Sequence, residues 1–133
     1  GSEMCIRDRI WMETMKEIEN TQQALDLFEK YSISRGKALE TGNSKVANYN
    51  YDRIENVIRF LREKKELSKL SVFYNHLNAF VKLDAAAYLL PVFEKESLKV
   101  MKEIMKVEGI VSFDAEMTIK EWKNGNLRNF YTL

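Results

Sequence analysis

The segment Phe80-Val81-Lys82-Leu83-Asp84-Ala85 is followed 30 residues later by Ile110-Val111-Ser112-Phe113-Asp114-Ala115, which repeats much of its apolar and polar pattern. The match continues on both sides, where it pairs Glu66 with Glu96, Lys69 with Lys99 and Leu89 with Ile119. A period of roughly 20–50 residues is typical of stacked supersecondary units. Each unit has an apolar face that only its neighbours can bury. The repeat therefore predicts one continuous core, into which point Val81, Ala85, Val111 and Ala115.

Elsewhere the apolar residues recur at helical spacing, and alternating strand patterns are weak. We expect main helices at about 21–40, 45–64, 66–76, 78–90, 93–107 and 110–123, with 10–20 as an extension or a short lead-in helix. The expected fold is all-α: a short right-handed α-α superhelix of about six helices, or a compact α-α bundle. Paired helices at this period favour the superhelix.

Three expectations concern the core. On the helix at 45–64, the apolar positions are Ala47, Tyr51, Ile54, Ile58 and Leu61. The helix at 78–90 is apolar nearly all round, so it should be buried on more than one face. The methionines at 101, 105 and 117 are expected to fill core space rather than to form a flexible binding strip.

The domain organisation is predicted to be simple. Residues 10–125 form one helical domain, and 126–133 form a tail whose Leu127, Phe130 and Tyr131 dock on the last helical pair. Gly1-Ser2 resembles the remnant of an expression tag, and Met4 to Arg9 resembles a translated sequencing-library adapter. Residues 1–9 are therefore expected to be non-native, and Cys5 to have no biological role.

The composition argues against several partner classes. The net charge is +1 and the charges are evenly distributed along the chain, whereas nucleic-acid binders usually carry a basic stripe, although folding can still gather local patches. The longest apolar run, Ala85 to Pro91, is too short to cross a bilayer. One cysteine allows no internal disulfide, which fits a reducing cytoplasm. We expect no nucleic-acid or membrane partner and a cytoplasmic location.

Signatures of catalysis are scarce in this chain. The single histidine, His76, falls at an expected helix end, where a turn or capping role is more common than catalysis. No Gly-rich phosphate loop is present, and one histidine cannot supply the paired Glu-x-x-His motifs of a di-metal carboxylate site. We therefore expect no enzyme activity and no catalytic, metal-binding or cofactor-binding residues.

Two surfaces are candidates for contact with a partner protein. One is a stripe on the second helix of each repeat, which holds Ala79, Lys82 and Ala86 in the first copy and Ser112, Glu116 and Lys120 in the second. The other is a patch of Asn48, Tyr49 and Asp52, since Tyr and Arg are enriched at interface hot spots and Arg35 could reach this patch. The plainer alternatives are a solvated face for the stripe and, for the patch, a polar clasp between the first two main helices.

The segment from His76 to Leu89 resembles the second helix of a HEAT repeat, with a polar turn, Val81, a basic residue, a pair of alanines and then Leu89. The second copy departs from it, because Ser112 replaces the basic residue and Glu116 replaces the second alanine. Together with the stretch from Arg35 to Asp52 and the helix from Ala115 to Trp122, the chain is similar over about 20–125 to a family of small bacterial HEAT-like proteins of unknown function.

Members of such families are often encoded beside toxins, as immunity proteins of polymorphic or contact-dependent toxin systems. The resemblance implies an α-α superhelix of HEAT- or armadillo-like hairpins, and we expect no cofactor. It also implies the leading function: a protein-binding module that binds a cognate toxin domain and blocks its active site. The alternative is a generic scaffold or adaptor that docks a cellular protein.

Overall fold

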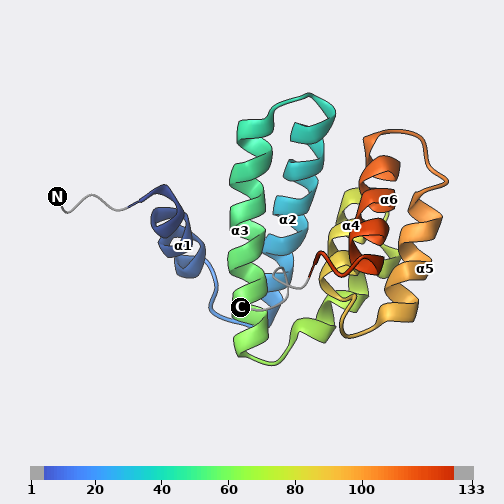
Figure 1. Ribbon diagram of the computed structural model, residues 1–133. Coiled ribbons are helices and arrows are strands. Elements are labelled where there is room, and N and C mark those ends of the chain that lie inside the picture. Colours follow the sequence, from blue (N-terminus) through green and yellow to red (C-terminus); the bar gives the residue numbers. More distant parts are fainter. Residues whose placement is uncertain (1–4, 128–133) are drawn as a thin grey trace. The chain divides into compact units, whose positions relative to one another are not determined.

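The computed structural model describes residues 5–127, which form seven helices and no strand (Figure 1). In chain order these are α1 (Ile6–Lys16), α2 (Thr21–Glu40), α3 (Ser44–Glu63), the 3-10 helix η1 (Leu67–Asn75), α4 (Ala79–Tyr88), α5 (Glu94–Ile104) and α6 (Ile110–Lys123). The all-α class is confirmed. The count within the described residues is seven instead of about six, because the lead-in segment forms a helix of its own.

The described chain consists of two compact units, one up to Leu67 and one from Ser68 onward. The first contains α1, α2 and α3, and the second contains α4, α5 and α6. In both units, helices that follow one another pack as hairpins, α2 with α3 and α5 with α6, which is consistent with the expected α-α superhelix. The single domain at 10–125 stays a prediction.

The turn between α2 and α3 shows why these helices pair. Gly42 has a φ of 73°, which suits a residue without a Cβ, and the backbone N–H of Asn43 donates to the carbonyl of Ala38 at 2.8 Å. The Asn43 side chain then accepts from the N–H of Val46 at 3.1 Å and so caps α3. Residues 41–43 thus end α2 and begin α3.

The core of the first unit follows the expected periodicity at most positions. Its buried apolar side chains on α2 and α3 include Ala24, Phe28, Ala38, Ala47, Ile54, Val57, Ile58 and Leu61. Tyr51 is a correction, because it was expected in this apolar face and lies exposed. Its phenol hydrogen-bonds Glu55, a polar contact that suits a position beside solvent.

In the second unit the helices lie close to the expected ranges. The segment expected as a helix at 66–76 is a helix of the tighter 3-10 type. Asn78 caps α4 by accepting from the N–H groups of Phe80 and Val81 at 2.9 and 3.2 Å. α4 ends at Tyr88, earlier than expected. Pro91 contributes to this end, because a proline disfavours the helical backbone conformation for the residue before it.

The shared core of the repeat is confirmed. The side chains at the two pairs of matched positions are all buried: Val81, Ala85, Val111 and Ala115. On α5 the inward positions are Ser97, Val100, Met101 and Ile104, and Ser97 shares a 2.6 Å hydrogen bond with the hydroxyl of Tyr74. The expected docking of Phe130 and Tyr131 lies outside the described residues, as does Gly1-Ser2.

Candidate functional site

The two copies of the repeat bury different amounts of matched surface. On α4, Phe80 is 4% exposed and Leu83 is 2% exposed. Their counterparts on α6 are Ile110, which is 42% exposed, and Phe113, which is 61% exposed. α4 is therefore buried on more than one face, as expected, whereas α6 buries one face and presents its other apolar face to solvent.

The exposed residues of α6 form a continuous line. Ile110, Phe113 and Met117 are spaced by three and four residues, so they lie along one face of the helix. We call these three residues the apolar row. Val107, in the turn before α6, is also exposed. Singly exposed apolar residues are ordinary, but contiguous ones typically mark an interaction surface.

The apolar row corrects one prediction. Met101 is buried as expected of core filler, but Met105 and Met117 are exposed. Helical spacing alone cannot separate the two cases, because Met117 belongs to an apolar line that looks like a second buried face. The sequence does contain one indication of the exposed face: α6 has more apolar residues than a single buried face requires.

Only part of the stripe expected on the second helices is exposed to solvent. Ala86 is fully buried, so the expectation that it contacts a partner is wrong: its small side chain lets neighbouring residues pack over α4. Lys82 is half-buried, and the Ser112 hydroxyl donates to the carbonyl of Met105 at 2.8 Å. Glu116 and Lys120 face solvent and form an ion pair of 3.3 Å with each other.

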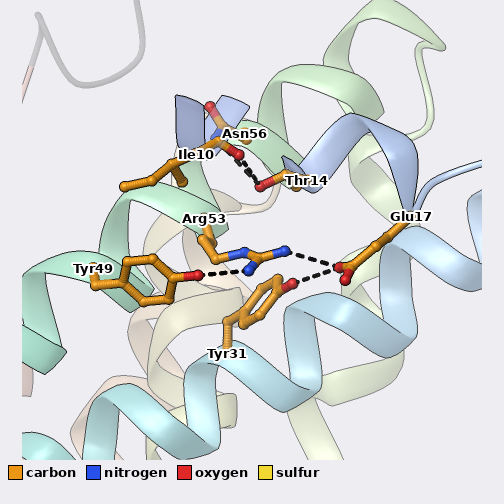
Figure 2. Close-up of polar contacts among 7 residues, drawn as sticks. All are labelled: Ile10, Thr14, Glu17, Tyr31, Tyr49, Arg53 and Asn56. Carbon is orange, nitrogen blue, oxygen red and sulfur yellow. Dashed lines mark hydrogen bonds and ion pairs between the residues drawn. The ribbon is translucent and has the colours of Figure 1, made fainter. Parts of the chain in front are cut away.

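One residue of the patch on α3, Tyr49, contacts Arg53, which was not among the expected site residues. Asn48 is exposed and Asp52 is half-buried, while the hydroxyl of Tyr49 accepts a 2.7 Å hydrogen bond from Arg53 Nη1. Arg53 Nη2 also lies 2.9 Å from Glu17 Oε2, just after α1. Figure 2 shows the guanidinium of Arg53 between the side chains of Tyr49 and Glu17.

Tyr31 of α2 completes this arrangement, which we call the Arg53 cluster: Glu17, Tyr31, Tyr49 and Arg53. The Tyr31 hydroxyl donates to Glu17 Oε2 at 2.8 Å, and its ring lies 4.5 Å from the guanidinium carbon of Arg53. A guanidinium over an aromatic ring gains a cation–π attraction, which strengthens where water is excluded. A polar clasp between helices therefore exists, but it uses these residues and extends to α1.

Burial and the neighbouring groups have opposite effects on the pKa of Arg53. Burial alone would lower the pKa of Arg53, but the Tyr49 hydrogen bond and the neighbouring Tyr31 and Glu17 raise it overall, so the guanidinium stays charged. Burial and the hydrogen bond to Glu17 raise the pKa of Tyr31 above its ordinary value. Neither group is tuned to exchange a proton near neutral pH, and the geometry is that of a structural tie.

A second polar contact supports the same tie. The Thr14 hydroxyl on α1 donates to the carbonyl of Ile10 at 2.8 Å and receives a long, 3.5 Å contact from the Asn56 amide on α3 (Figure 2). Ile10 and Thr14 are buried. α1 is therefore held on α3 by apolar and polar contacts together.

The remaining residues of chemical interest have local roles. His76 Nδ1 accepts a 2.9 Å hydrogen bond from the N–H of Asn78, so it forms part of a turn, as expected. Within residues 5–127, no group of three or more His, Cys, Asp or Glu side chains is placed to hold a metal ion. Over the same residues, no helix combines the length and apolarity needed to cross a membrane.

Comparison with protein-family models, with curated proteins and with solved structures gives no match to this chain. The HEAT-like resemblance therefore rests on the residues quoted for it. The strongest candidate site is the apolar row of α6, since it is an exposed surface whose counterpart on α4 is buried.

Proposed function

We propose that this protein is a non-enzymatic binding module that docks a partner protein on the apolar row of α6. The observation that carries the proposal is the difference between matched positions, with Leu83 2% exposed and Phe113 61% exposed. In repeat arrays, a neighbouring element covers each unit's apolar face. A partner protein that packs on α6 would cover this exposed apolar face in the way that a neighbouring element covers the apolar face of a repeat unit.

The chemistry of the row suits a protein partner. Aromatic side chains supply a large contact area at low entropic cost, and they dominate interface energetics. Phe113 is the central residue of the row, between Ile110 and Met117, where hot spots concentrate. The ion pair of Glu116 and Lys120 lies on the same helix and offers a polar rim.

The proposed partner is a cognate bacterial toxin domain, whose active site this protein would block. This step rests on the HEAT-like resemblance of the repeat, whose relatives are often encoded beside toxins. Among the surface residues expected from the sequence, Glu116 and Lys120 would flank the contact, and Asn48, Tyr49 and Asp52 would form a secondary patch on the first unit.

The test is survival of cells that express the product of the gene adjacent to this one in its source genome. Co-expression of the wild-type protein should restore growth, and Phe113→Asp should abolish protection while the variant remains folded. Asp26→Ala, a change at an exposed position of α2, is the matched control and should protect fully. Equal killing with and without the wild-type protein would refute the toxin role. Binding that depends on Phe113 without protection would indicate an adaptor.

A further inference from the structure

A line of lysines runs along the outer face of α5. Lys95, Lys99 and Lys102 lie on α5 within an arc of about 60° on a helical wheel, and Lys106 follows in the turn after the helix ends at Ile104. We call these four the lysine row. All four are exposed, and the buried side of α5, which contains Val100, Met101 and Ile104, faces the opposite way.

Positive charge is in excess on this row within the described part of the chain. No ion pair there involves any of the four lysines. Of the acids on α5, Glu94 accepts a 2.8 Å hydrogen bond from the indole of Trp122. Glu96 and Glu103 lie three and four residues from Lys99, beside the row, so the four lysines outnumber the acids next to them.

The lysine row opposes the stability of its own helix. Like charges three or four residues apart repel one another on a helix surface. Lys95 also lies in the first turn of α5, where the helix dipole favours anions over cations. Glu96 and Glu103 lie three and four residues from Lys99 and offset part of this repulsion, so the face keeps an excess of positive charge.

The row borders an open, shallow groove. Its lining consists of the four lysines together with Leu98 and Glu103. Leu98 is half-buried and adds an apolar position beside the charges. The lining therefore combines positive charge with one apolar contact and a single carboxylate.

We propose that the lysine row docks a carboxylate-rich helical segment of the partner protein, with an apolar side chain of that segment resting on Leu98. The proposal rests on the proposed protein-binding function and names the chemistry of the partner. Acids spaced three and four residues apart on a partner helix would match the lysines in register, because both follow the same helical period.

The lining favours a protein segment over a nucleic acid. Among residues 5–127, the lining contains no aromatic side chain on which a base could stack and no arginine to bind phosphate in a bidentate way. Glu103 would repel a phosphate backbone, whereas an acidic helix can place an apolar or basic residue opposite it.

The test uses a designed helical peptide of about 18 residues, with a leucine row flanked by glutamates, and its glutamine-substituted version. Fluorescence anisotropy at about 50 mM salt measures binding to the wild-type protein and to K99E/K102E. The matched control is K37E/K45E, which makes the same charge change at exposed lysines of the first unit. We expect binding to K99E/K102E to weaken at least about tenfold and the control to stay within about twofold.

Circular dichroism must show that both double variants remain folded. Equal losses for the two variants, or equal affinity for the glutamate and glutamine peptides, would overturn the proposal. Tighter, lysine-dependent binding of a single-stranded DNA of about 20 nucleotides would reassign the row to nucleic acid. The survival test of Phe113→Asp is read separately, so failure of the toxin role and failure of the lysine row remain distinguishable.

Discussion

α4 and α6 carry the same repeated segment, but they use it differently. At matched positions both helices bury one face, which includes Ala85 on α4 and Ala115 on α6. α4 also buries its second apolar face, which includes Leu83, whereas α6 exposes the equivalent face at Phe113. The comparison teaches that a repeated apolar pattern specifies what can be buried, and that the neighbouring elements determine what is buried.

The largest expected effect comes from placing a charge at matched positions of the two helices. Leu83→Asp buries a carboxylate in a packed core and should lower the free energy of unfolding by about 4 kcal/mol or more. Phe113→Asp changes an exposed side chain and should cost less than about 1 kcal/mol. Urea unfolding of both variants measures the difference. Equal destabilisation would mean that α6 is covered and would remove the basis for the apolar row.

The second largest effect tests whether the stability of the first unit depends on polar contacts, as the stability of α4 depends on apolar burial. Arg53→Ala removes a buried guanidinium that bonds Tyr49 and Glu17, and it should lower the free energy of unfolding by about 2 kcal/mol. The value stays below that of a fully buried pair because Glu17 is half-exposed. Denaturant unfolding measures it.

Arg59→Ala is the control for this prediction. Arg59 forms an exposed ion pair of 3.9 Å with Glu63 and lies 4.4 Å from the Trp11 ring. Both contacts are near solvent, so the substitution should cost no more than about 1 kcal/mol. A cost for Arg53→Ala as small as this would show that the Arg53 cluster does not tie α1 to α2 and α3.

Alkaline pH should weaken the first unit through Tyr31. Burial raises the pKa of this tyrosine above its unfolded value of about 10, so the folded protein holds the proton more tightly. The associated stability is fully present below pH 10 and falls above it, by up to about 1.4 kcal/mol per pH unit. Tyr31→Phe should show a shallower loss when unfolding is measured between about pH 9 and 11. Equal slopes would contradict this account.

The smallest effects concern two helix ends that differ in one residue type. Gly42 ends α2 with a φ of 73°, and Lys65 follows α3 with a φ of 57°. Gly42→Ala should cost about 1 kcal/mol, because a Cβ strains the left-handed region even where space is open. Lys65→Gly should stabilise the protein by about 0.5 kcal/mol through relief of the same strain. Thermal melting measures both, and shifts of the same sign would argue against the turn assignment.

Much of the fold could be predicted from the sequence because the apolar spacing and the turn residues agree. The range of α2 is as expected, and Gly42 and Asn43 mark the turn that follows it. The burial of Val81 and Val111 follows from the repeat itself. These features depend on local propensity and on one apolar face per helix, both of which a single sequence records.

The candidate surfaces were harder to predict, because they depend on what lies across from each face. The apolar pattern of α6 contains Met117 and Phe113 whether or not another element covers them. Arg53 was not predicted either, since its partner Glu17 is distant in sequence and the contact exists only after α1 folds back on α3. The lysine row was visible in the spacing from Lys95 to Lys106, but an even overall charge balance hid it.

The most direct test of the central claim is the affinity of purified wild-type protein and Phe113→Asp for the product of the adjacent gene, measured by calorimetry. The apolar row predicts a loss of at least about tenfold in affinity with little change in melting temperature. Unchanged affinity for the folded variant would contradict the claim that the exposed face of α6 is the docking surface.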